Sequence, residues 1–156
     1  HDWYSGATIL SAVEPLAQDE AHIQLTNKIV EESTHLSKLF KGECHFVDCY
    51  FGEDNSISLN SEDKENTNRA RHYAKLSEYC REASVENSNI HLELDLPEDA
   101  IIRTAEEIDP ELVILGTSGR INMLFDLTSH TSGQIIDKVN CDLLVMKPDN
   151  FMSLIH

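Results

Sequence analysis

Residues 116–134 hold the strongest candidates for binding chemistry in the chain, because they are spaced as in a phosphate-binding loop. Gly116 and Gly119 follow an apolar run. Glycine at these positions allows tight turns and lets an anion approach backbone N–H groups closely. Arg120 is the only cation of the segment. It either contacts phosphate or stands exposed at the tip of the loop, and the sequence supports both interpretations equally.

The second half of this segment supplies hydroxyl groups and the start of a helix. Ser129, Thr131 and Ser132 could donate hydrogen bonds to phosphate oxygens. Thr131 and Gln134 have the spacing of a capping box, which predicts a helix from Thr131 through Val139. The positive end of that helix would favour an anion. In the alternative interpretation the glycines only shape the loop and the hydroxyls only cap the helix, and spacing alone does not decide.

Apolar runs that are typical of strands alternate with helical patterns along the whole chain. Strands are expected at residues 7–13, 44–51, 90–96, 112–116 and 143–147, and helices at 19–40, 62–83, 97–109 and 131–139. This order predicts an α/β fold in which a five-stranded parallel sheet has helices on both faces. Ligands of such sheets lie beyond the carboxyl ends of the strands, where the strand order reverses, so the loops after the first and fourth strands are the expected site.

The apolar pattern also predicts where some of these elements lie. The run at 112–116 is unbroken, which indicates a central strand covered on both faces. The strand at 90–96 alternates apolar with polar residues and is expected near a sheet edge, and the apolar strand at 143–147 comes last and is expected at an edge too. On the helix at 62–83 the buried stripe is expected to consist of Tyr73, Leu76, Cys80 and Ala83.

Most catalytic classes of α/β protein are disfavoured by missing motifs. The loop after the first strand reads VEPLAQDE, without the glycines of a dinucleotide-binding or P-loop enzyme, and the chain has no G-x-S-x-G elbow. Glu14 and Asp95 could be imagined as a carboxylate pair for acid–base chemistry, but nothing beside them supplies a nucleophile or an oxyanion site. We therefore expect a protein that is not an enzyme.

Composition indicates an acidic, globular chain. Its 156 residues fit a single domain, 1–156, with a core over 7–148, and the net charge of −16 disfavours nucleic acid and anionic membranes as partners. No apolar run approaches the roughly 20 residues that a membrane span needs, and we see no signal peptide. Because the chain starts at His1 and not at Met, an upstream region is left open.

The cysteines and histidines do not have the spacing of a metal site. The four cysteines lack a C-x-x-C pair and are expected to be free thiols, three of them in or beside apolar runs, which suits the cytoplasm. The eight histidines are scattered. His22, His35 and His45 could be combined into a site on paper, but we expect no metal.

Taken together, these features resemble the universal stress protein family, over nearly the whole chain from the first strand to about Pro148. The resemblance implies an adenine-nucleotide alpha hydrolase-like sandwich whose fourth strand leads into G-x2-G-x9-G-(S/T), a signature for the phosphates and ribose of ATP. Gly116 and Gly119 match its first half, whereas Ser129 and His130 stand where the third glycine and the Ser/Thr belong. The stretches ELVILGTSGR and CDLLVMKPDNF are similar to those of tandem members, so the chain could be one half of such a protein.

Three other positions of the family's nucleotide site can be assigned to individual residues of this chain. The acidic residue near the adenosine falls on Glu14, the backbone contact to adenine falls on Cys49, and the glycine of a G-x-P motif is replaced by Asp95. Glu14 and Asp95 would place negative charge near a triphosphate, which Mg²⁺ would offset only in part. The Cβ of Ser129 would obstruct the approach that glycine permits, and neutral His130 offers only one N–H. We therefore expect ATP or AMP, with Mg²⁺, to bind weakly or not at all.

The resemblance also implies that the last strand pairs with its counterpart in a second domain. A chain without that domain would form a homodimer, with Leu144 and Met146 at the edge. The sequence thus favours a non-enzymatic domain of the bacterial stress response that acts through pairing and has a degenerate nucleotide site. The alternative is a regulatory module that retains binding of ATP or AMP.

Overall fold

Eight helices and strands make up the part of the chain that the computed structural model describes, residues 5–50, 61–86, 89–117, 135 and 137–148. The strands are β1 (Thr8–Ala12), β2 (Glu43–Cys49), β3 (Ile90–Glu93), β4 (Leu112–Gly116) and β5 (Asp142–Met146), and the helices are α1 (Glu20–Leu39), α2 (Ser61–Ala83) and α3 (Pro97–Ile108). The strands form one sheet in the order β3-β2-β1-β4-β5, and every pairing is parallel. This confirms the five-stranded parallel sheet.

The strand order reverses beside β1. The chain moves outward from β1 to β2 and β3, crosses back to β4 on the other side of β1, and ends at β5. Ile9 of β1 is in register with Cys44 of β2 and with Leu112 of β4, so the carboxyl ends of these three strands lie at one edge of the sheet. The expected site, beyond the first and fourth strands, therefore falls at the switch point of the sheet.

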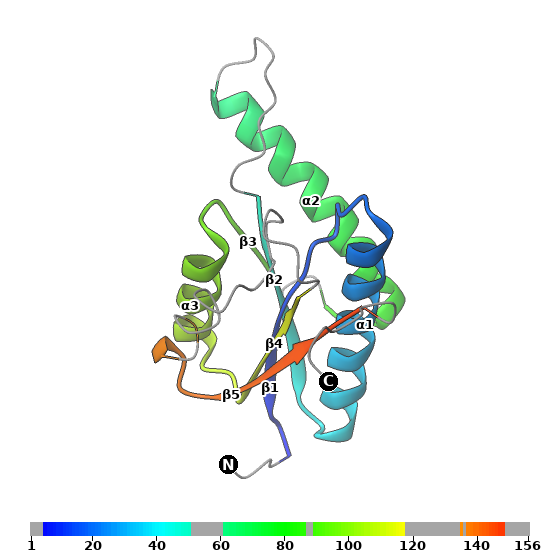
Figure 1. Ribbon diagram of the computed structural model, residues 1–156, viewed down its shortest axis with the longest axis vertical. Helices are drawn as coiled ribbons and strands as arrows, with labels where there is room; N and C mark the ends of the chain where they lie inside the picture. Colours follow the sequence, from blue (N-terminus) through cyan, green and yellow to red (C-terminus); the bar gives the residue numbers. More distant parts are fainter. Residues whose placement is uncertain (1–4, 51–60, 87–88, 118–134, 136, 149–156) are drawn as a thin grey trace, which may run out of the picture.

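Helices cover both faces of the sheet, as Figure 1 shows. Alternation along β2 sends Phe46 into the core beneath α1 and α2 and Val47 into the core beneath α3. The buried Ile135 joins the α3 side. Each face of β2 thus supports its own apolar cluster, and strands buried on both faces are what a parallel sheet requires.

The positions of the central and edge strands agree with the sequence. All five residues of β4 are buried, since β4 lies between β1 and β5 and is covered on both faces. β3 and β5 are the two edge strands. Figure 1 shows the amino-terminal part of α2 extending past the carboxyl ends of the strands. Within the described residues, no helix combines the length and the apolar character needed to cross a bilayer.

Two local predictions were wrong. Tyr73 was placed on the buried stripe of α2, but its side chain is 44% exposed and His72 is buried instead. The strand expected over 90–96 ends at Glu93, because the next residues turn into α3, where Pro97 occupies the first turn and Leu96 is the N-cap.

Candidate functional site at the carboxyl ends of the strands

Glu14 lies just beyond β1, and its backbone is tied to α1. The Thr26 hydroxyl of α1 donates to the carbonyl oxygen of Glu14 at 3.2 Å, and the Ala17 N–H donates to the same oxygen at 3.2 Å. Val13, one residue earlier, donates to the carbonyl of Val47 at 3.1 Å, which extends the β1–β2 pairing. These bonds fix the half-buried Glu14 at the switch point, where the sequence placed it.

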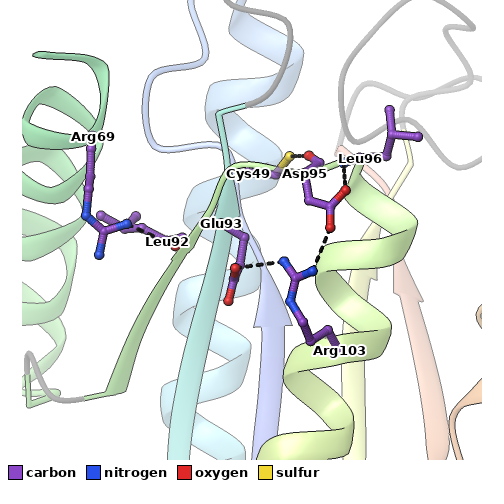
Figure 2. A network of polar contacts seen from close by, with 7 residues as sticks. All are labelled: Cys49, Arg69, Leu92, Glu93, Asp95, Leu96 and Arg103. Atoms are coloured by element: carbon purple, nitrogen blue, oxygen red, sulfur yellow. Dashed lines mark hydrogen bonds and ion pairs between the residues drawn. The ribbon is translucent and has the colours of Figure 1, made fainter. Parts of the chain in front are cut away.

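Cys49 ends β2, and its fully buried side chain is directed at the loop after β3. Its thiol donates to the carbonyl oxygen of Asp95, a contact drawn in Figure 2. The adjacent Tyr50 N–H donates to Glu93 at 3.2 Å. The Cys49 side chain therefore holds the β2 and β3 ends together, and only its backbone is left for the ligand contact that the family resemblance implies.

Asp95 has a cationic partner that the sequence did not reveal. Arg103 of α3 lies 2.7 Å from Asp95 Oδ2 and 2.8 Å from Glu93 Oε2, so one guanidinium bridges two carboxylates (Figure 2). The hydrogen bond from Arg103, followed by that from the Leu96 N–H, lowers the pKa of Asp95. Arg103 therefore balances part of the negative charge that Asp95 is expected to bring to the site, and the cluster of Glu93, Asp95 and Arg103 keeps a net negative charge. The signal in the sequence was an arginine on the second turn of the helix that follows E-x-D.

Gly116 ends β4, and its lack of a side chain is required by helix packing. A Cβ at this position would lie 2.6 Å from Leu25 Cδ2, 2.8 Å from Leu25 Cγ and 3.0 Å from Ile29 Cδ1. Both of these α1 side chains are buried in the core. The sequence offered two roles for this glycine, the shape of the loop and the approach of phosphate, and the structure adds a third that involves no ligand.

The remaining predicted positions of the loop, Gly119, Arg120, Ser129, His130 and Thr131, lie outside the described residues. Just before them, the Thr117 N–H donates to the Met146 carbonyl at 2.9 Å, so the loop starts alongside the end of β5. After them, the Val139 N–H donates to the Ile135 carbonyl at 2.9 Å, as in the helix expected there. Of the candidate residues, Glu14, Cys49 and Gly116 are thus placed at the ends of three neighbouring strands.

Two hollows that are lined by described residues lie away from this edge. One of about 570 Å³ opens between the second halves of α1 and α2 and is lined by residues such as Lys38, Tyr79 and Ser84. It includes neither Glu14 nor Gly116. Nor do the described histidines, cysteines and carboxylates form a group of three or more that could hold a metal ion, so the combination of His22, His35 and His45 is not assembled.

Fold and site together define a doubly wound α/β domain whose candidate site lies at the switch point of its sheet. A sequence model of the universal stress protein family matches residues 7–147. The chain belongs to the universal stress protein family.

Curated relatives extend beyond this chain. It is 29% identical over 157 aligned residues to universal stress protein E of Salmonella typhi, a match that covers 97% of this chain and 50% of the relative. It is 29% identical to the universal stress protein E homolog of Haemophilus influenzae, a match that covers 94% of this chain and 50% of the relative. The chain therefore spans about half the length of the curated relatives that it matches.

Solved structures show the same fold. A putative universal stress protein from Pseudomonas aeruginosa matches with a TM-score of 0.72 and 26% identity, over 96% of this chain and 50% of that one. A family member from Arabidopsis thaliana, solved with AMP bound, matches with a TM-score of 0.58 and 13% identity. The match covers 92% of this chain and 93% of that one. A universal stress protein in complex with cAMP matches with a TM-score of 0.56 and 12% identity. The match covers 93% of this chain and 99% of that one.

Proposed function

We propose that this chain is a non-enzymatic universal stress protein domain of the bacterial stress response, which acts by pairing with a second domain of its kind. The observation that carries this proposal is the free side of β5. Among the described residues β5 pairs only with β4, and its other side is a sheet edge. An apolar edge strand is a template for pairing with another chain or domain.

The side chains of β5 suit an interface. Val145 is 41% exposed, and Leu143, Leu144 and Met146 are half-buried. A run of four apolar residues at an edge exposes surface that a second strand would remove from water. The curated relatives are about twice as long as this chain, which supports a second domain of similar size as the partner. Where no such domain is attached, the partner is a second copy of the chain.

We further propose that the nucleotide site is degenerate. Ser129 and His130 replace the glycine and the small hydroxyl residue of the signature, and the retained Gly116 is accounted for by its packing against Leu25 and Ile29. The half-buried Glu14 adds negative charge at the end of β1. The relatives solved with AMP and with cAMP support the alternative, a regulatory module that retains nucleotide binding.

Calorimetric titration of the full chain decides between these two functions. With MgCl2 present, ATP, AMP and cAMP are each expected to give dissociation constants far above the micromolar range. A low-micromolar constant for any of them would overturn the degenerate site and establish the regulatory module. Gly119→Ala is the control, since a Cβ at that position should abolish genuine loop binding and leave adventitious binding unchanged.

The same protein tests the absence of catalysis. We expect no steady release of phosphate from ATP above a blank without protein. Release that Gly119→Ala abolishes would show that the chain is an enzyme after all.

We also propose a cytoplasmic location and no nucleic-acid or membrane partner. Three cysteines are buried free thiols and the fourth is half-buried and free, as suits a reducing compartment. The net charge of −16 repels polyanions. Fractionation of cells that produce the protein, with its redox state trapped by alkylation, tests the location, and a disulfide-bonded pool outside the cytoplasm would contradict it.

A further inference from the structure

Two histidines on neighbouring strands face each other on the α3 side of the sheet. His45 Nδ1 of β2 lies 2.9 Å from His91 Nε2 of β3, and the two ring centroids are 5.2 Å apart with an interplanar angle of 31°. His45 precedes Cys49 by four residues, so it lies about 13 Å along the strand from the carboxyl edge. This pair is therefore separate from the candidate nucleotide site.

A carboxylate fixes the protonation of one ring. Glu43 Oε1 lies 3.1 Å from His45 Nε2. Because a carboxylate accepts hydrogen bonds, His45 carries a proton on Nε2, and in the neutral form of the ring the lone pair of Nδ1 is directed at His91. A histidine that donates its second N–H to a carboxylate is the usual arrangement of a metal ligand, since it orients the ring and raises the basicity of the free nitrogen.

The charges around the pair suit a cation. Burial, followed by the nearby His45, lowers the pKa of His91. The negative charges of Glu107 of α3 and Glu93 of β3 act in the opposite direction and raise the pKa of His91, so both carboxylates lie close enough to interact with this ring electrostatically. Together with Glu43, which lies 3.1 Å from His45 Nε2, they place negative charge beside the two imidazole rings.

We propose that His45 and His91 form a two-imidazole site for a divalent transition-metal ion such as Zn²⁺. Two nitrogens that bind a tetrahedral Zn²⁺ are about 3.3 Å apart, compared with 2.9 Å in the hydrogen bond between these rings. Metal binding therefore replaces that hydrogen bond, and both rings turn until their lone pairs converge on the ion beside the line that joins the two nitrogens. His91 moves its proton from Nε2 to Nδ1 on binding, without net proton release. Water or an outside ligand completes the coordination, because the described residues supply no group of three protein ligands. Such a site is exchangeable and discriminates against Mg²⁺ and Ca²⁺, which prefer oxygen.

Zinc titration of the chelator-treated full chain tests this site. The wild-type protein is expected to bind one equivalent of ZnCl2 that MgCl2 does not displace. His45→Gln and His91→Gln should each weaken this binding at least tenfold. His35→Gln, at an exposed position on α1, is the matched control and should leave the affinity unchanged. Unaltered stoichiometry and affinity in the double variant His45→Gln/His91→Gln would overturn the proposal.

Imidazole nitrogen NMR on the wild-type chain gives a test that requires no variant to fold. Without metal, His45 should show a proton on Nε2, and addition of ZnCl2 should shift the resonances of His45 Nδ1 and His91 Nε2. Zinc-dependent shifts confined to other histidines would refute the site. Glu43→Gln should weaken zinc binding about tenfold or more, and an unchanged affinity would remove Glu43 from it. Because nucleotide titration involves none of these residues, the two proposals succeed or fail independently.

Discussion

At the scale of single residues, Gly116 shows how the absence of a side chain can serve two purposes. Its position at the end of β4 matches a phosphate-binding signature, whereas its surroundings show that Leu25 and Ile29 occupy the space that a Cβ would need. The first property was visible in the sequence because it depends on local spacing. The second was not, because it depends on a helix that lies about ninety residues earlier in the chain.

We predict that Gly116→Ala destabilises the fold by about 1–3 kcal/mol, as overpacking of a close-packed core does. Leu25→Ala makes room for the added methyl group, so the double variant should lose less stability than the sum of the two single variants. Urea unfolding measures all three. Additive losses would show that the two positions do not press on each other.

Burial makes the core thiols poor nucleophiles. Burial, with a smaller effect of Cys44, raises the pKa of Cys80 from 9.0 to about 11. At pH 8 its thiolate fraction is then about a hundredth of that of an ordinary thiol. The protonated thiol is the form that the folded state favours. The stability that the folded protein gains from keeping Cys80 protonated is therefore complete below pH 9 and is lost as the pH rises toward 11.

We predict that iodoacetamide at pH 8 modifies the half-buried Cys141 before Cys44, Cys49 or Cys80, which are buried. Mass spectrometry of peptides taken over time follows each site. In urea all four should react at similar rates, which controls for peptide detection. Alkylation of Cys80 as fast as Cys141 in the folded protein would contradict the prediction.

At the scale of elements, α2 shows what periodicity can and cannot predict. The existence and the end of this helix follow from its sequence, but the predicted stripe placed Tyr73 in the core and left His72 out. His72 Nδ1 lies 2.5 Å from Asp48 Oδ2 of β2, and both side chains are buried. A hydrophobicity pattern cannot see a partner on another element, although an aspartate inside the apolar strand CHFVDCY was a signal that some polar group must meet it.

Breaking this buried pair is predicted to be costly. His72→Leu leaves Asp48 without this partner inside the core and should reduce the free energy of unfolding by about 3–5 kcal/mol. Asp48→Leu together with His72→Leu removes both polar groups and should cost less than His72→Leu alone. Lys75→Ala, which removes an exposed pair with Glu78 on the same helix, is the control and should have little effect. Chemical denaturation distinguishes these outcomes, and a double variant less stable than His72→Leu would contradict this account.

At the scale of the whole molecule, the parallel sheet, its central and edge strands and its two covered faces could be predicted, whereas the chemistry of the switch point could not. Alternating strands and helices allow few parallel topologies, and the apolar run of β4 identified it as central. The bridge from Arg103 to Asp95 and Glu93 depends on how the chain turns from β3 into α3, which the pattern of apolar residues does not show. The second half of the loop, including Ser129 and His130, stays a prediction from sequence alone.

Pairing through β5 is the prediction that belongs to this scale. Leu144→Glu or Met146→Glu places a charge at the proposed interface and should convert a homodimer into a monomer in sedimentation velocity runs. Leu94→Glu introduces the same charge at a residue that is 50% exposed just beyond the opposite edge strand, β3, and should leave the dimer intact. A dimer that survives both β5 variants would place the interface elsewhere.

The hydrogen bond from the Thr117 N–H to the Met146 carbonyl joins the start of the candidate loop to the end of the proposed pairing strand. Any molecule held by that loop would therefore act on backbone that also carries the partner. Thermodynamic linkage makes such an effect reciprocal: a ligand that tightens association by a given factor is itself bound more tightly by the same factor in the associated form. A ligand affinity measured on the isolated chain would then depend on whether the chain is monomeric or associated. Ligand affinity and association should therefore be measured together.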